Sequence, residues 1–146
     1  MVPATAGTKK MNRGQLIEEL KFDEGQILTL YKCSAGKNTI GVGRNLDDRG
    51  ITEDESSYLL SNDIDISIDE LEKTFSWFGE LSDARQRVLI NMHFNLGLTQ
   101  LLGFKKFLAA MEAGEWETAG EEMLDSRWAK QVGDRSIRLQ TLLLEG

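Results

Sequence analysis

Two side chains in the first third of the chain are placed where they could take part in a reaction. Glu24 ends a helical pattern, and Thr39 lies in the Gly-rich strand pattern that continues to Gly43. A carboxyl group and a hydroxyl group on adjoining walls of a cleft can cleave a glycosidic bond, because the acid protonates the leaving oxygen and the hydroxyl helps to place a water. Gly41 and Gly43 are poor strand residues unless something must approach the backbone closely.

The position of Glu24 is itself informative. A Glu at the C-terminal end of a helix lies on the unfavourable side of the helix dipole. This indicates that something other than stability selected an acid there. The interpretation as an ordinary solvated acid stays open at this stage.

The single cysteine, Cys33, lies beside a predicted turn and is flanked by Lys32 and Lys37. One cysteine excludes an internal disulfide, which fits a reducing compartment. Nearby cations would lower the pKa of the thiol. One His and one Cys do not make a metal site, so we expect no metal and no cofactor. His93 and the three tryptophans are interpreted as structural residues.

Composition narrows the class of protein. The chain has 146 residues, is 40% hydrophobic and carries a net charge of −7. This acidic balance argues against nonspecific nucleic-acid binding and against attraction to anionic membranes. No apolar run approaches the roughly 18–20 residues of a membrane helix, and the first ten residues lack the apolar stretch of a signal peptide. We expect a chain made in the cytoplasm that binds no nucleic acid and does not insert into membranes.

Capping signals and periodicity predict the elements that hold these residues. Asn12 with Gln15 and Thr52 with Glu55 resemble capping boxes, the first opening a helix over 13–23 that Gly25 ends. A β-hairpin or small meander follows. Further helices are expected from Thr52 past Ile68, and near 83–96, 104–113, 115–125 and 135–144, the last with Asp134 as its N-cap.

We therefore predict a mostly α, α+β protein with two lobes. Residues 1–11 are read as a flexible tail. Residues 12–65 form an N-terminal lobe with the active-site helix end and the small β-hairpin. Residues 66–146 form a larger, all-α C-terminal lobe.

Several separated motifs occur in an order that resembles one known family. Near the start are Phe22-Asp23-Glu24-Gly25, Tyr31-Lys32 and Thr39-Ile40-Gly41-Val42-Gly43. Later come Ile90-Asn91-Met92 with Phe94 and Gly97, Gly103-Phe104, Trp116, Ser126-Arg127-Trp128, and Arg135 with Arg138. From about Met11 onward the chain resembles the T-even phage lysozyme family of glycoside hydrolases. The resemblance implies a lysozyme-like fold.

The family's active site is a Glu, an Asp and a Thr at a fixed spacing. The resemblance implies that Glu24 is the general acid and that Thr39 helps to hold the nucleophilic water. The middle position is Cys33, where the common pattern has Asp, although some similar phage lysozymes also carry Cys. Two unit charges about 5 Å apart, at an effective dielectric near 20, interact by roughly 3 kcal/mol. A neutral thiol facing an oxocarbenium-like transition state loses most of that.

Three explanations of Cys33 remain open. It is ionised by Lys32 or Lys37, or it acts mainly by orienting water with Thr39. Alternatively, a different carboxylate such as Asp47 or Asp48 helps.

The resemblance also points to substrate-binding residues. Phe94 and Asn95 match cleft-lining positions, and Arg135 matches an Arg expected to contact the catalytic acid or the substrate. Phe107 and Glu122 stand where the family has other sugar-contacting residues, so subsites differ.

A second departure follows the Gly-x-Gly stretch. The family often has a His there, paired with an Asp on the next helix. The matching residues are Arg44 and Asp63, for which we predict an ion pair that does not titrate near about pH 6–7.

The function implied by the resemblance is that of a phage endolysin. It would hydrolyse the β-1,4 bond from N-acetylmuramic acid to N-acetylglucosamine in peptidoglycan, with inversion and without a cofactor or metal. It would act as a monomer and wait in the host cytoplasm until a holin releases it to the cell wall. The alternatives are a lytic transglycosylase, which needs only one catalytic carboxyl, and a non-catalytic peptidoglycan-binding domain.

Overall fold

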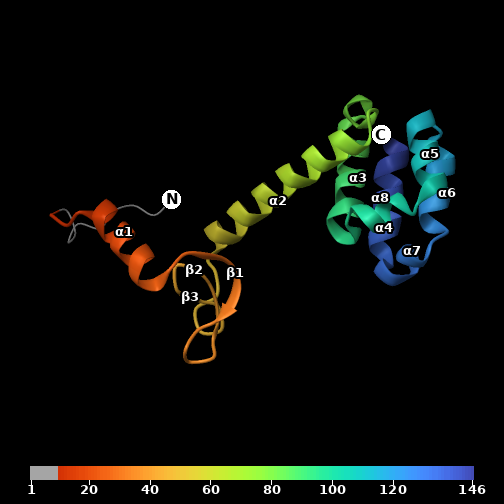
Figure 1. Cartoon of the computed structure of the whole chain (residues 1–146). Helices are drawn as coiled ribbons and strands as arrows, with labels where there is room; N and C mark the ends of the chain where they lie inside the picture. The colour runs from red at the N-terminus through yellow and green to blue at the C-terminus, as the bar shows by residue number, and fades with distance from the viewer. Residues whose placement is uncertain (1–9) are drawn as a thin grey trace. The chain divides into compact units, whose positions relative to one another are not determined.

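The computed structural model describes residues 10–146, which divide into two compact units (Figure 1). The N-terminal unit ends at Leu59 and the C-terminal unit runs Leu60–Gly146. One helix and a three-stranded sheet form most of the first unit, whereas the second is helical. This confirms the predicted mostly α, α+β class. The predicted tail over 1–11 lies almost wholly outside the described residues, and the lobe boundary after residue 65 stays a prediction.

Local signals set the bounds of helix α1 (Arg13–Glu24). The side chain of Asn12 accepts a hydrogen bond from the backbone N–H of Gln15 at 2.9 Å, which satisfies one free donor of the first turn. At the other end the N–H of Gly25 donates to the Lys21 carbonyl at 2.9 Å, with a φ of 77° that favours glycine. The predicted helix and its glycine stop are confirmed, and Glu24 is its last residue.

The sheet has the order β1-β2-β3 and is antiparallel throughout. Thr39 lies on the central strand, paired with Tyr31 on one side and with Asn45 on the other. The predicted small meander is confirmed. Its strands are β1 (Ile27–Lys32), β2 (Asn38–Gly41) and β3 (Arg44–Asn45).

Helix α2 (Glu53–Thr74) begins in the first unit with the predicted capping box. The backbone N–H of Thr52 donates to Glu55 Oε1 at 2.8 Å, and the N–H of Glu55 donates to Thr52 Oγ1 at 3.1 Å. Two free donors of the first turn are thus satisfied reciprocally.

The predicted pair of Arg44 with Asp63 is wrong. Arg44 donates from Nη1 and Nη2 to the two carboxylate oxygens of Glu55, at 2.8 and 2.6 Å. Its Nη1 also donates to the Gly50 carbonyl at 3.2 Å. The first turn of α2 therefore supplies the anion, and the two-pronged geometry matches the planar guanidinium.

This pair gives stability a defined pH dependence. Bonds from Arg44 and Thr52 lower the pKa of Glu55 from its ordinary 4.5 to about 2. A carboxylate whose pKa is depressed by folding stabilises the fold above its unfolded pKa, and the effect is lost as the pH falls through the folded pKa. We expect Glu55→Gln to lower the urea midpoint at pH 7, with a gap to wild type that closes between about pH 4.5 and about pH 2.

The matched control for that measurement is Glu53→Gln. Glu53 shares the acidic first turn of α2 with Glu55. A pairing effect requires that its midpoint follow wild type across the same pH range. An equal loss in both variants would mean that the helix dipole, rather than Arg44, stabilises Glu55.

The C-terminal unit packs its helices around one apolar core. Helix α6 lies against α5 and α8, and α3 lies against α4 and α8. Leu71, Leu89, Met92, Leu101 and Leu143 are among the fully buried residues. The helices are η2 (Phe78–Glu80, a 3-10 turn), α3 (Asp83–Leu96), α4 (Leu98–Leu102), α5 (Lys105–Ala113), α6 (Trp116–Leu124), α7 (Arg127–Val132) and α8 (Asp134–Glu145).

Two details of this unit differ from the sequence prediction. The short helices α4 and α7 were not predicted, and Asp134 is the first residue of α8 rather than its N-cap, which is Gly133.

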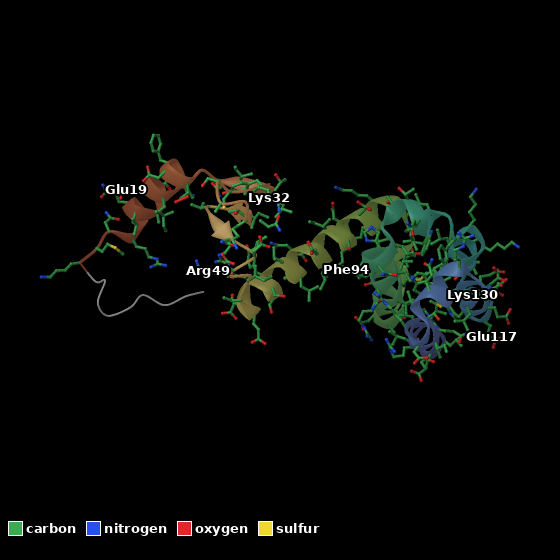
Figure 2. All side chains as sticks on the ribbon, turned by 90° about the horizontal axis from the view of Figure 1, so that it is seen from below. Glu19, Lys32, Arg49, Phe94, Glu117 and Lys130 are labelled. Atoms are coloured by element: carbon green, nitrogen blue, oxygen red, sulfur yellow. The ribbon has the colours of Figure 1, made fainter. Side chains whose placement is uncertain are left out.

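Charged side chains such as Glu117 and Lys130 stand out from the helices (Figure 2). None of the helices described in residues 10–146 combines the length and the apolarity needed to cross a membrane.

His93 has a structural environment, as predicted. Its Nδ1 lies 3.0 Å from Ser67 Oγ and its Nε2 lies 2.8 Å from Glu70 Oε1. The imidazole therefore joins α3 to α2 inside the C-terminal unit. Both His93 and Ser67 are buried, so each polar atom needs the partner it has.

Candidate active site

Glu24 extends from the end of α1 toward the turn that joins β2 and β3. A Cβ atom built on Gly43 would lie 3.1 Å from Glu24 Oε2, closer than ordinary packing allows. Gly43 also has a φ of 67°, a backbone angle that residues with a side chain rarely adopt. Of the two glycines predicted to permit a close approach, Gly43 has the Glu24 carboxylate against its backbone, whereas within residues 10–146 no atom beyond its chain neighbours would lie within 4 Å of a Cβ atom built on Gly41.

Cys33 and Thr39 meet at one backbone carbonyl. The N–H of Cys33 and the hydroxyl of Thr39 both donate to the carbonyl of Lys37, each at 2.9 Å. Cys33 follows β1, and Thr39 is the second residue of β2. Thr39 is only 2% exposed and Cys33 is half-buried. The turn between the two strands thus brings the two predicted water-holding residues together.

The turn around Cys33 lowers the pKa of its thiol. The backbone N–H groups of Lys37 and then Ala35 lower the pKa of the thiol. A bond from the Thr39 hydroxyl to the sulfur would lower this pKa further, but it is an alternative to the bond that the hydroxyl donates to the Lys37 carbonyl. The predicted direction of the pKa shift is confirmed, but its cause differs. Backbone dipoles of the turn act on the sulfur, while the ammonium group of Lys37 pairs with Asp48 at 3.3 Å.

The two other acids considered in this region have different partners. Asp47 accepts from the backbone N–H and the side chain of Asn38, at 2.8 and 3.1 Å. Asp48 accepts from the side chain of Asn45 at 3.0 Å and from the Lys37 ammonium. Within residues 10–146 neither carboxylate has a hydrogen bond to Cys33 or Thr39. The bonds from Asn38 also lower the pKa of Asp47.

The three remaining predicted residues lie in the C-terminal unit. Arg135 donates to Asn91 Oδ1 from Nε at 3.0 Å and from Nη2 at 2.8 Å. Phe94 is 48% exposed and lines the same groove of about 590 Å³ as Arg135. Asn95 accepts from the indole N–H of Trp128 at 2.8 Å. Glu24 belongs to the other unit, so a contact between it and Arg135 stays a prediction.

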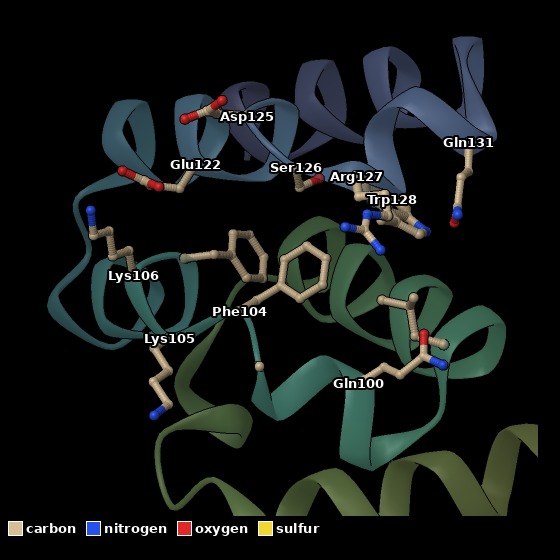
Figure 3. A pocket seen from close by; sticks show the side chains of 13 residues that line it. Gln100, Phe104, Lys105, Lys106, Glu122, Asp125, Ser126, Arg127, Trp128 and Gln131 are labelled. Carbon is tan, nitrogen blue, oxygen red and sulfur yellow. The ribbon is translucent and has the colours of Figure 1, made fainter.

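A second groove of the C-terminal unit was not predicted from the sequence. Its volume is about 950 Å³, and Figure 3 shows Phe104 and Trp128 inside it, with Glu122 and Arg127 at its walls. The two aromatic rings pack edge to face, with centroids 6.1 Å apart. Trp128 connects the groove to Asn95. The motifs around Gly103-Phe104 and Arg127-Trp128 were the available signal, but their meeting depends on tertiary packing.

The two positions at which the resemblance implies changed sugar contacts have different environments in the structure. Phe107 is 1% exposed, so its side chain belongs mainly to the core beneath the groove. Glu122 lines the groove (Figure 3). One change therefore adds packing and the other adds an acidic wall.

Comparison with known proteins identifies the family to which this chain belongs. The family model described as phage lysozyme matches residues 21–143, a range that includes every predicted site residue. A probable T4-type lysozyme 1 of Dictyostelium discoideum is 31% identical, over 87% of this chain and 92% of its own. A probable T4-type lysozyme 2 of the same organism is 28% identical, over 90% and 94%.

A phage protein is similar as well. The pre-baseplate central spike protein Gp5 of Enterobacteria phage T4 is 27% identical over 90% of this chain, which corresponds to 28% of that longer protein. The chain is therefore a glycoside hydrolase of the lysozyme class. It belongs to the phage lysozyme family, and peptidoglycan is its substrate.

Proposed function

We propose that this lysozyme is an N-acetylmuramidase that hydrolyses the β-1,4 bond from N-acetylmuramic acid to N-acetylglucosamine. Glu24 protonates the leaving oxygen, and Cys33 with Thr39 holds the attacking water. The observation that carries the proposal is the Lys37 carbonyl, which accepts from the backbone N–H of Cys33 and from the hydroxyl of Thr39, each at 2.9 Å, and so holds the two residues close together. In this proposal Cys33 has the role that Asp has in the family's common pattern.

The hydrogen-bond geometry supports a water-holding role for Thr39. A hydroxyl has one proton and two acceptor lone pairs. The proton of Thr39 is directed at the Lys37 carbonyl, so the oxygen is left to accept from a water. A water that donates to Thr39 keeps a lone pair for attack on the anomeric carbon.

Cys33 supplies the second half of this water site. Because its thiol pKa is lowered by the turn, a thiolate can accept the proton that the water loses, or stabilise positive charge on the sugar. Glu24 comes from a different element, the end of α1. Direct displacement requires an acid and a water site on opposite faces of the sugar ring, and the proposal assigns these roles to Glu24 and to Cys33 with Thr39.

Substrate positioning is proposed for Phe94, Asn95 and Arg135. Phe94 offers an exposed ring, and Arg135 is held in place by Asn91. Asn95 fixes Trp128, whose ring lines the larger groove. Aromatic faces and fixed polar groups are suited to sugar rings, which have apolar faces and polar edges.

Analysis of released muropeptides tests the bond specificity. Purified peptidoglycan is digested with wild type and with Glu24→Gln, and the products are identified by mass spectrometry. We expect reducing-end N-acetylmuramic acid from wild type and none from Glu24→Gln. Reducing-end N-acetylglucosamine would contradict the proposed bond, and anhydro-muramyl products would identify a lytic transglycosylase, which the missing second carboxylate at Cys33 favours.

We further propose a biological role as a monomeric endolysin. The phage protein among its relatives supports a phage setting, in which the enzyme waits in the host cytoplasm until a holin opens the membrane. Expression in the cytoplasm of a Gram-negative host tests this. The culture should stay turbid until the inner membrane is permeabilised by a holin or by chloroform, whereas spontaneous lysis would contradict dependence on a holin.

A further inference from the structure

One peptide group connects Asp47 to both proposed water-holding residues. The carbonyl of Lys37 accepts from Cys33 N–H and from the Thr39 hydroxyl, each at 2.9 Å. The other half of the same peptide group is the N–H of Asn38, which donates to Asp47 Oδ2 at 2.8 Å. The two hydrogen bonds therefore run in the same direction. The Thr39 hydroxyl donates to the carbonyl of the peptide group, and the N–H of that peptide group donates to the Asp47 carboxylate.

Such a chain is polarised by its charged end. A carboxylate that accepts from an amide N–H shifts electron density toward the carbonyl oxygen of that amide, which becomes a better acceptor. The bond from Thr39 to Lys37 is strengthened as a result. This polarisation depends on the negative charge of the Asp47 carboxylate, not on the size of the side chain.

The strength of that acceptor decides where the Thr39 proton points. Two acceptors compete for the proton of the Thr39 hydroxyl, namely the carbonyl oxygen of Lys37 and the thiolate sulfur of Cys33. If the proton turns to the sulfur, the hydroxyl oxygen and the thiolate no longer both face the water. A strong Lys37 carbonyl keeps both as acceptors for the water.

We propose that Asp47 is a positioning residue for hydrolysis, which acts through the 37–38 peptide group on the Thr39 hydroxyl. The inference rests on the proposed role of Thr39. Asp47 is not a catalytic residue, since its two oxygens are bonded to Asn38 rather than aimed at Cys33 or Thr39. A second bond, from Leu46 N–H to the Asn38 carbonyl at 2.7 Å, holds Asn38 against the segment that follows β3.

The neighbouring acid provides a matched control. Asp48 carries the same charge and is also exposed, but it bonds to Asn45 and to the Lys37 ammonium rather than to the peptide group. Substituting either acid by Asn removes one negative charge from the same turn with little change in shape. A difference between the two variants therefore reports on the peptide group.

Steady-state kinetics on soluble peptidoglycan fragments tests the proposal. We expect Asp47→Asn to lower kcat about tenfold, the cost of weakening one charge-assisted hydrogen bond, with KM changed less than about twofold. Asp48→Asn should keep kcat within about twofold of wild type. Asp47→Glu, which keeps the charge, should recover part of the loss.

A double-mutant cycle separates positioning from a structural role. In a Thr39→Val background, Asp47→Asn should cause no further loss of kcat, because the hydroxyl it acts on is gone. Equal losses in the wild-type and Thr39→Val backgrounds, or equal kcat for Asp47→Asn and Asp48→Asn, would overturn the proposal. If instead Thr39→Val is as active as wild type, the proposed role of Thr39 itself has failed.

Discussion

Replacing Glu24 by Gln should lower kcat by about a thousandfold, within the range that general acids contribute. The amide has nearly the same shape but cannot give a proton to the leaving oxygen. Because Glu24 is exposed and its carboxylate lies against the backbone of Gly43, urea unfolding should change little. KM should also stay near wild type, since the loss falls on the transition state.

The control for that substitution is Asp23→Asn. Asp23 precedes Glu24 in the last turn of α1 and is also exposed. It should retain wild-type kcat, which would exclude a general effect of charge at the helix end. Equal activity of Glu24→Gln and wild type would remove Glu24 from the mechanism, even if Asp23→Asn behaved as expected.

Cys33 should show the second large effect. We expect Cys33→Ala to lower kcat about a hundredfold, the lower end of what one stabilising group contributes in an active site. Cys33→Asp should stay active and extend activity to lower pH. The reason is that a carboxylate remains charged at pH values where even a thiol of lowered pKa is protonated.

The pH profile distinguishes thiolate chemistry from simple packing. The thiol pKa is lowered, and the thiolate is lost as the pH falls through that pKa. Wild-type kcat should therefore rise toward alkaline pH along a limb that Cys33→Ser lacks, because Ser does not titrate there. A limb that persists unchanged in Cys33→Ser would rule out a role for the thiolate.

The parts of the fold that depend on local sequence were predicted well. Asn12 and the pair of Thr52 with Glu55 cap helices by bonds to residues three positions away. A signal of that range can be read from the sequence. Helices α4 and α7 were missed because each is short and lies next to glycine-punctuated or motif-like segments, where periodicity has too few positions to register.

Predictions that depended on which side chains meet were less successful. Helix α2 carries several acids, and only the position of β3 beside the first turn of α2 selects Glu55 over Asp63 as the partner of Arg44. The turn of Arg44 toward that end is a tertiary effect. The family resemblance correctly implied that Arg44 pairs with an acid on the next helix, but it implied the wrong acid.

The candidate site was predicted as a set of residues but not as a network. Glu24, Cys33 and Thr39 were identified by spacing and resemblance. The Lys37 carbonyl that joins two of them is a backbone group, and backbone groups carry no sequence signal. The same holds for the N–H groups that act on the thiol, where the flanking lysines had been the visible candidates.

The central claim is that a water held by Cys33 and Thr39 attacks the sugar directly. Proton NMR of the first reducing ends, recorded before the anomers interconvert, tests it most directly. Direct displacement at a β-linked sugar predicts the α-anomer as the initial product. An initial β-anomer would show two displacements through a covalent intermediate, and would contradict the account.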